Sequence, residues 1–237
     1  MDPVDQVVRG ARAYTQQAGL APLDVEPQHA LMTQPASQAI GQAYDRMPAF
    51  DSGALPAYHA MREETMRQFD HMTKPVSRGG MGIDVESVNH DPYGGGNVNK
   101  AVGEFHNDVV NNSRMKVMST ASTGGHPVFS NDDNDAFRAV HDVFGHLGSG
   151  RGIDFDGEEA AYQKHSQMFS PLARQAMATE TRGQNSALRM HGDFQDQKVG
   201  ILPEHMQGLQ FSRIGGPAAL AAAAKRAGAK NREQGLA

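Results

Sequence analysis

The amino-acid sequence predicts an α+β fold that is mostly helical and contains a small sheet. Three observations lead to this prediction. Apolar residues recur at helical spacing over residues 58–72 and again over 98–109. The segments 81–85 and 115–119 have the short apolar pattern of β-strands. The order helix, strand, helix, strand favours a small sheet flanked by helices, with parallel strands as one option.

Residues 1–50 mix Ala, Gln and Pro and hold few large apolar side chains. Apolar spacing between residues 4 and 11 is compatible with one short amphipathic helix, whereas Pro22, Pro27 and Pro35 favour extended chain. We therefore predict an N-terminal arm over residues 1–50, followed by a globular core over residues 51–210.

Helix boundary signals divide the second half of the core. Three Asp residues between 132 and 135 favour a helix start, because acidic side chains suit both the cap and the helix dipole. The Gly-rich segment 148–157 predicts a loop that leads into a helix near Glu158. Ser170 and Pro171 suit the N-cap and first position of the next helix, for which Gly183 is a candidate left-handed cap.

Residues 217–237 are Ala-rich, which favours helix but offers almost nothing large to bury. We predict a C-terminal extension over residues 211–237. Both ends of the chain are poor in core-forming residues, so we expect them to lie against neighbouring protein chains. The basic residues between Pro217 and Ala237 are Lys225, Arg226, Lys230 and Arg232.

Composition excludes several classes of site and partner. The 237 residues include no cysteine, so thiolate metal sites, disulfides and cysteine nucleophiles are excluded, and any metal must be held by His, Asp or Glu. With 22 basic and 27 acidic residues the net charge is −5, which restricts the expected nucleic-acid contact to the basic C-terminal extension. The longest apolar run, residues 218–224, is too short to cross a bilayer, and we expect no membrane partner and no signal peptide.

The densest polar segment contains His141, Asp142 and His146, with Glu180 further along the chain. Two His and one carboxylate form the ligand set of a facial triad, which leaves metal positions open for substrate, oxygen or water. Residues five apart point about 140° apart on an α-helix, so the two imidazoles converge only where the chain leaves α-helical geometry. Gly145 makes such a departure feasible.

Other assignments of these residues remain open at this stage. Hydrogen bonding at a helix end is the alternative role for the two His, and pairing with Arg182 or Arg174 is the alternative for Glu180. Glu158 and His165, seven residues apart on one helix face, offer a second ligand pair or simply a polar face. We expect contacts to the ligands or to substrate from five residues: Asp142, Arg182, Gln184, Glu158 and His165.

The string His-Asp-Val-Phe-Gly-His at 141–146 resembles the iron-binding motif of the aromatic amino acid hydroxylases, although Gly148 stands where that family usually has Pro. The resemblance implies that His141 and His146 are imidazole ligands, with Glu180 as the candidate carboxylate. It covers about six residues. The metal it implies is iron, and zinc is equally compatible with the residue types.

A longer resemblance, over about residues 54–203, is to an uncharacterised domain of bacteriophage and prophage proteins. The strings that carry it are 114–117, 134–142, 157–160, 165–173 and Thr-Glu-Thr-Arg-Gly-Gln-Asn-Ser at 179–186. It implies a phage-encoded, virion-associated protein, found in the virion or the host cytoplasm, with other virion chains as partners.

The predicted function is that of a virion-associated protein with a His141, His146 and Glu180 site for a divalent metal, whose activity is oxidative at iron or hydrolytic at zinc. The alternative is a non-catalytic structural or internal virion protein, which binds neighbouring chains through its terminal arms. In that case the same polar cluster would hold two helices together. Whether the protein is an enzyme is left open by the sequence.

Overall fold

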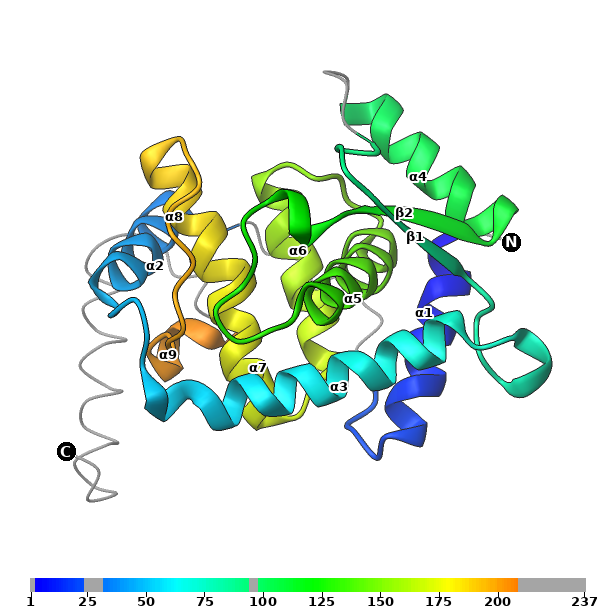
Figure 1. Cartoon of the computed structure of the whole chain (residues 1–237), viewed down its shortest axis with the longest axis horizontal. Helices are drawn as coiled ribbons and strands as arrows, with labels where there is room; N and C mark the ends of the chain where they lie inside the picture. Colours follow the sequence, from blue (N-terminus) through cyan, green and yellow to red (C-terminus); the bar gives the residue numbers. More distant parts are fainter. Residues whose placement is uncertain (1–2, 24–31, 94–97, 209–237) are drawn as a thin grey trace.

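The computed structural model describes residues 3–23, 32–93 and 98–208. These residues form mostly helices with one small parallel sheet, which confirms the α+β class (Figure 1). The α-helices are α1 (Pro3–Gln17), α2 (Gln34–Arg46), α3 (Leu55–Thr73), α4 (Val98–Asn112), α5 (Asn131–His141), α6 (Phe155–His165), α7 (Pro171–Ala178), α8 (Gln184–His191) and α9 (Glu204–Gln207). Two π-helical turns occur at Asp142–Leu147 and Thr179–Gly183, and short 3-10 helices at Ser52–Ala54, Val76–Arg78, Thr120–Ser122 and Ser166–Met168.

The sheet consists of β1 (Asp84–Val88) and β2 (Arg114–Met118), which pair in parallel with Asp84 opposite Arg114. Helix α4 connects the two strands, as the alternating order predicted. Met115 and Val117 of β2 are buried, so this strand turns its apolar side chains toward the core.

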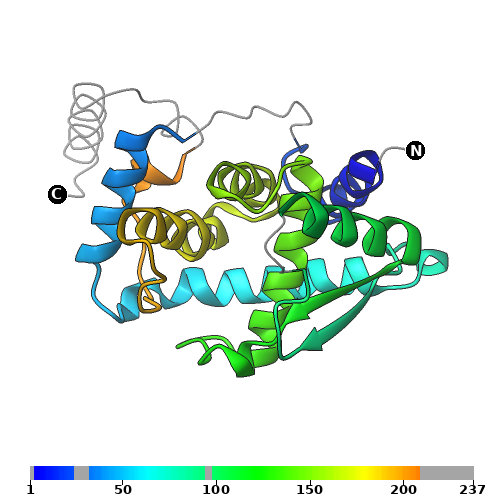
Figure 2. The same cartoon turned by 90° about the horizontal axis from the view of Figure 1, so that it is seen from above.

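Helix α3 runs along the length of the molecule in both views and packs against α5 and α7 (Figures 1 and 2). Tyr58, Met61, Thr65 and Met72 of the predicted apolar stripe are buried, and Phe69 is partly buried. The predicted helix over this stripe is therefore confirmed.

The segment predicted as an arm differs from the expectation, because its helices α1 and α2 belong to the core. Val7 and Tyr14 of α1 and Ile40 and Tyr44 of α2 are all buried. Small residues make this packing possible: a Cβ at Gly41 would lie 2.9 Å from the backbone oxygen of Ser186 in α8. An arm over residues 1–50 is thus wrong for the described residues. The predicted extension over 211–237 lies outside them.

The core has two hydrophobic clusters with the site residues at their junction. The first cluster lies among α2, α3 and α7 and includes Phe137 and Phe169; the second lies among α1, α4, the sheet and α5 and includes Phe144. The ring of His165 in α6 contacts all three of these phenylalanines, with centroids 5.0–6.3 Å away. His165 is fully buried between the two clusters.

The predicted start of α7 is confirmed, because the Ser170 hydroxyl accepts a hydrogen bond from the Ala173 backbone N–H and Pro171 is the first helical residue. The predicted end is wrong. Gly183 has a helical φ of −62°, and the chain continues through the second π turn into α8. The left-handed cap is Gly192, with φ +82°.

Candidate metal centre

The first π turn brings the two predicted imidazole ligands to one face. Helix α5 begins with a capping box between Ser130 and Asp133, and the π turn follows directly after His141. Hydrogen bonding in a π turn joins residues five apart, so His141 and His146 lie one above the other instead of diverging. The predicted departure from α-helical geometry near Gly145 is therefore confirmed.

Gly145 is required here for a second reason, which is the close approach of α6. A Cβ at this position would lie 3.0 Å from the Ala161 side chain and 3.1 Å from the Ala161 carbonyl oxygen. The absence of a side chain lets α6 pack directly against the π turn. This contact carries Glu158, in the first turn of α6, to the two imidazoles.

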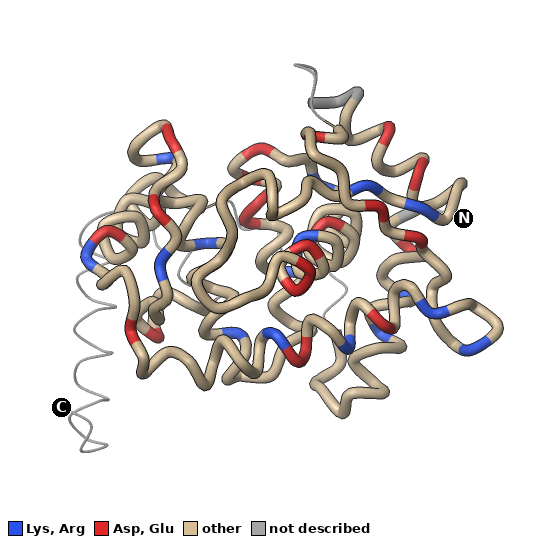
Figure 3. Tube along the Cα trace, in the orientation of Figure 1, with Lys and Arg blue, Asp and Glu red and all other residues tan. Residues whose placement is uncertain are grey.

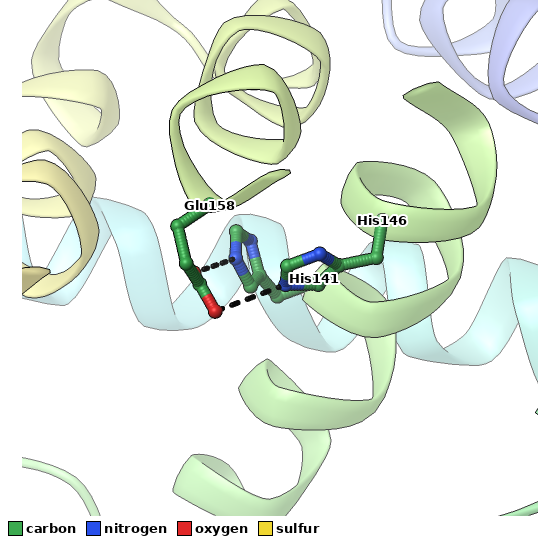
Figure 4. Close-up of side chains that lie close together, drawn as sticks. All are labelled: His141, His146 and Glu158. Atoms are coloured by element: carbon green, nitrogen blue, oxygen red, sulfur yellow. Dashed lines mark ion pairs between the residues drawn. The ribbon is translucent and has the colours of Figure 1, made fainter. Parts of the chain in front are cut away.

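His141, His146 and Glu158 form a group that can hold a metal ion, with one ligand atom from each within 4.8 Å of the others. The Nε2 atom of His146 lies 3.4 Å from Glu158 Oε1, and that of His141 lies 3.8 Å from Oε2. The ring centroids are 5.2 Å apart at 80°. Figure 4 shows all three side chains pointing toward one another from α5, the π turn and α6.

The orientation of His146 is fixed by the Gly-rich loop. Its Nδ1 lies 3.0 Å from the carbonyl oxygen of Gly152. A carbonyl only accepts, so Nδ1 carries the hydrogen, and the neutral ring has its lone pair on Nε2, facing Glu158. This is the usual arrangement of a metal-ligating His whose other nitrogen is held by a backbone carbonyl.

The orientation of His141 is fixed through two further side chains. The Gln68 amide Nε2 donates to the Met168 carbonyl, so Gln68 Oε1 faces His165 Nε2 at 2.7 Å and accepts its hydrogen. The lone pair of His165 is then on Nδ1, 3.1 Å from His141 Nδ1, which must donate. The lone pair of His141 is therefore also on Nε2.

The Nε2 atom of His141 is buried and has no hydrogen-bond partner. Leaving a buried polar atom unsatisfied costs about 1–3 kcal/mol, so such atoms are rare without a reason. Two imidazole nitrogens and a carboxylate oxygen within 4.8 Å of one another are a donor set that a divalent cation satisfies. The residues present thus fit a metal ion.

In the metal-free protein, burial and the neighbouring charges shift the pKa values of the side chains at this site. Burial disfavours the charged form of His146, but the hydrogen bond with Glu158 and its negative charge outweigh burial and raise the pKa of His146 to about 9. Burial alone would raise the pKa of Glu158, yet the two imidazoles hold it well below its usual value. Burial, with the nearby charges of His141 and His146, lowers the pKa of His165, which keeps that ring neutral.

Glu180, predicted as the carboxylate ligand, lies elsewhere and is replaced in the group by Glu158. Its Oε1 accepts from the Tyr58 hydroxyl at 2.7 Å, and its Oε2 accepts from the side-chain amides of Gln184 and Gln197. His126 faces the same oxygen at 3.3 Å. Glu180 therefore joins α3, α8 and the segment leading to α9, with its acceptor positions already occupied.

The tautomer of His126 follows from its backbone contacts. Its Nδ1 accepts hydrogen bonds from the backbone N–H groups of Val128 and Phe129, so the hydrogen of the neutral ring is on Nε2, which lies 3.3 Å from Glu180 Oε2 without forming a hydrogen bond. No motif in the sequence marks His126 as a site residue.

Arg182 and Gln184, expected near the ligands, also have structural contacts. The Arg182 guanidinium pairs with Glu159, donates to the carbonyl oxygens of Met206 and Gly208, and stacks on the ring of Tyr162 at 4.2 Å. Gln184 binds Glu180. Of the five residues predicted to contact the ligands or substrate, His165 holds His141, Asp142 lies in the same π turn, and Glu158 is itself the third group member.

The carboxylate was misassigned because Glu180 was chosen as the downstream carboxylate that the resemblance to the iron-binding motif implies. Glu158 also lies downstream of both His residues, in the first turn of α6. The closest sequence signal was the pairing of Glu158 with His165, which placed both on one face of α6 but did not connect that face to His141. The missing information was the long-range packing of α6 on the π turn.

No protein-family model, curated protein or solved structure matches this chain, so its candidate centre is defined by its own geometry. Within the described residues, no helix combines the length and apolarity that crossing a bilayer requires.

Proposed function

We propose that this chain is a metalloprotein in which His141, His146 and Glu158 hold one divalent transition-metal ion, iron(II) or zinc. The observation that supports it most directly is the buried, unpartnered Nε2 of His141 opposite the Glu158 carboxylate. The hydrogen bonds to His165 and Gly152 direct the lone pairs of both rings toward the same carboxylate. Metal-ligating His residues are usually oriented in this way by a hydrogen bond to their other ring nitrogen.

Three protein ligands leave coordination positions for a water or a substrate. Structural zinc sites are closed by four protein ligands, whereas catalytic sites keep an open position. A His-His-carboxylate set with open positions is compatible with oxygen chemistry at iron and with water activation at zinc. We therefore infer a catalytic centre and propose enzymatic activity of one of these two classes.

The test is metal analysis of the purified protein, with reconstitution by Fe(II), Zn(II) and Mn(II) in turn. We expect about one equivalent in the native chain and its loss in His141→Ala. His59→Ala, which removes an exposed His of α3, is the matched control and should keep the metal. A native chain that takes up none of the three metals would overturn the proposal.

Bacteriophage origin and association with the virion remain part of the proposal, supported by the resemblance of the strings between residues 114 and 186. The corresponding test is a mass-spectrometric inventory of purified virions from the phage that encodes the chain. Peptides of this chain should copurify with the capsid proteins in constant ratio. Their absence from purified particles would contradict virion association.

A structural role is the second candidate, and one observation favours it. The hydrogen bonds from Gln68 through His165 to His141 join α3, α6 and α5 without any metal. If this were the whole function, metal would not raise the melting temperature. The metalloprotein proposal predicts a rise that grows with metal concentration, because an ion that binds only the folded chain stabilises it.

A further inference from the structure

A cavity of about 200 Å³ lies beside the candidate metal centre. Its wall is formed by α4, β2, the end of α5 with the first π turn, and the chain around Tyr93 and Ile153. In Figure 1 these elements lie together around the labels α4, β2 and α5. His146 belongs both to this wall and to the metal-binding group, so a molecule in the cavity would contact a metal ligand directly.

Most of the wall is apolar. The side chains that make it so are Tyr93, Val102, Phe105, Val117, Leu147 and Ile153. A cavity of roughly 150 Å³ accommodates benzene, so this volume suits a single ring with one substituent. The polar groups of the wall then determine what the substituent is.

Three basic side chains, Lys116, Arg138 and Arg151, line the cavity. Arg138 donates to the Met118 carbonyl and the Thr123 hydroxyl, which are neutral acceptors, and its charge interacts with that of Asp142 in the same wall. Among the described residues, neither Lys116 nor Arg151 has an ion-pair partner within 4.0 Å.

Two carboxylates, Asp91 and Asp142, oppose these three cations in the wall. Asp91 is exposed and accepts a hydrogen bond from the Tyr93 backbone N–H, so it belongs to the rim. The balance of formal charge is positive, in a chain whose net charge is −5. A positive apolar cavity in an acidic protein selects an anionic ligand with an apolar body.

We propose that this cavity binds the substrate of the metal centre, a molecule that combines an apolar body of about one ring with one anionic group, carboxylate or phosphate. The inference rests on the proposed metalloprotein function. The apolar body lies against α4 and β2, and the anionic group lies near Lys116 and Arg151. His146 places the bound molecule next to the metal.

The experiment uses simple probes with the full-length protein loaded with Zn(II). Benzoate and phenyl phosphate carry both features, benzyl alcohol lacks the charge, and acetate lacks the ring. We expect one of the two anionic ring compounds to bind at least tenfold more tightly than benzyl alcohol and acetate, and the comparison between them identifies the anionic group. Equal binding of all four probes, or of none, would overturn the proposal.

Charge-reversing variants locate the bound probe. Lys116→Glu and Arg151→Glu should each weaken binding of the anionic probe at least tenfold and leave binding of benzyl alcohol unchanged. Arg78→Glu is the control, because Arg78 is an exposed cation outside this cavity. If Arg78→Glu weakened binding of the anionic probe as much as Lys116→Glu and Arg151→Glu do, the proposed position of the anionic group would be wrong. Circular dichroism verifies that each variant is folded.

Replacing Zn(II) by paramagnetic Co(II) tests the connection to the metal. The ring protons of the bound probe should relax faster in the Co(II) protein, because the cavity shares His146 with the centre. A probe that binds without this effect would overturn the substrate role. Metal content is measured on the same samples. If the protein takes up no metal but still binds the anionic ring compound selectively, the metalloprotein function is refuted and the anion-selective cavity is retained.

Discussion

The tautomer of each proposed ligand is determined by atoms that never approach the metal. The Met168 carbonyl orients Gln68, Gln68 orients His165, and His165 orients His141. Each step follows from the donor or acceptor character of one atom. A change at Gln68 therefore acts on the ligand through two intervening hydrogen bonds.

Gln68→Ala should weaken metal binding by about 10–100-fold, the usual effect of losing an outer partner of a His ligand. His165 would lose the acceptor that fixes its hydrogen on Nε2, and the lone pair of His141 would no longer be held toward Glu158. The measurement is a competition titration with a metal-binding dye. Gln38→Ala on the exposed face of α2 should retain the native affinity; a similar loss there would refute the orienting role.

The two carboxylates are distinguished by a pair of matched substitutions. Glu158→Gln should abolish metal uptake, because it removes the charged oxygen ligand between the imidazoles. Glu180→Gln should retain uptake but lower the free energy of unfolding by about 1–3 kcal/mol, since the new amide group cannot accept from all its donors. Metal analysis and urea denaturation give both quantities. The reverse pattern would restore Glu180 as the ligand.

The raised pKa of His146 predicts how the metal-free protein responds to pH. Its pKa is about 9 in the folded chain against about 6.5 unfolded, so between these values the folded state binds more protons. Its stabilising contribution is therefore complete below pH 6.5 and is lost as pH rises through 9. The melting temperature of the metal-free protein should fall over this window, and it should fall less in His146→Gln.

Metal binding should release a proton, because His146 is protonated in the metal-free protein. At pH 7.5 the ion replaces the proton shared by His146 and Glu158, so roughly one proton should be released per metal bound. Calorimetric titration in two buffers with different ionisation enthalpies measures this number. Release of none would show that the ion binds elsewhere.

At the scale of elements, the first π turn brings His141 and His146, which are five residues apart in the sequence, together in one site. Gly145→Ala should lower the free energy of unfolding by about 1–3 kcal/mol, because the new methyl group lies within 3.1 Å of Ala161, including its backbone oxygen. The metal affinity should fall as well, since α6 carries Glu158. Thermal unfolding and dye competition are the measurements. Gly103→Ala, with open space around its Cβ position in α4, should leave both values unchanged or raise stability slightly.

Elements with strong local signals could be predicted from the sequence, and elements set by packing could not. The stripe of α3, the second strand, the acidic start of α5 and the cap at Ser170 follow from periodicity and local side-chain chemistry. The first strand was predicted over 81–85 and lies three residues later, at Asp84–Val88. Helix α2 was missed because Pro35 indicates extended chain in the sequence pattern, whereas it stands in the first turn of the helix after the Thr33 N-cap. The two His were predictable from their motif, whereas Glu158 required the contact between α6 and the π turn.

At the scale of the whole molecule, helices from both ends of the described chain complete the two clusters. Removal of residues 1–20 would eliminate α1, whose Val7 and Tyr14 pack in the same cluster as Phe144 of the π turn. We expect this truncation to lower the melting temperature and the metal content together. An independent arm would instead leave both unchanged, and far-UV circular dichroism with metal analysis separates the two outcomes.

Charge over the whole molecule is mixed in sign. Lys and Arg residues are distributed along the described trace together with Asp and Glu (Figure 3). The wall of the cavity beside His146 has more cations than carboxylates, whereas the whole chain has a net charge of −5. Single charge reversals in this wall therefore test its preference for anions. The four basic residues between 225 and 232 lie outside the described residues.

The five-residue spacing between His141 and His146 also shows how the chain accommodates an extra residue. Deleting one intervening residue would place the two rings four apart, a spacing at which an ordinary α-helix still presents both on one side. The chain would then leave in nearly the same direction, because five residues of a π turn and four of an α-helix each span slightly more than one turn. The π turn therefore inserts one residue between the two ligands without redirecting the loop that supplies the Gly152 carbonyl.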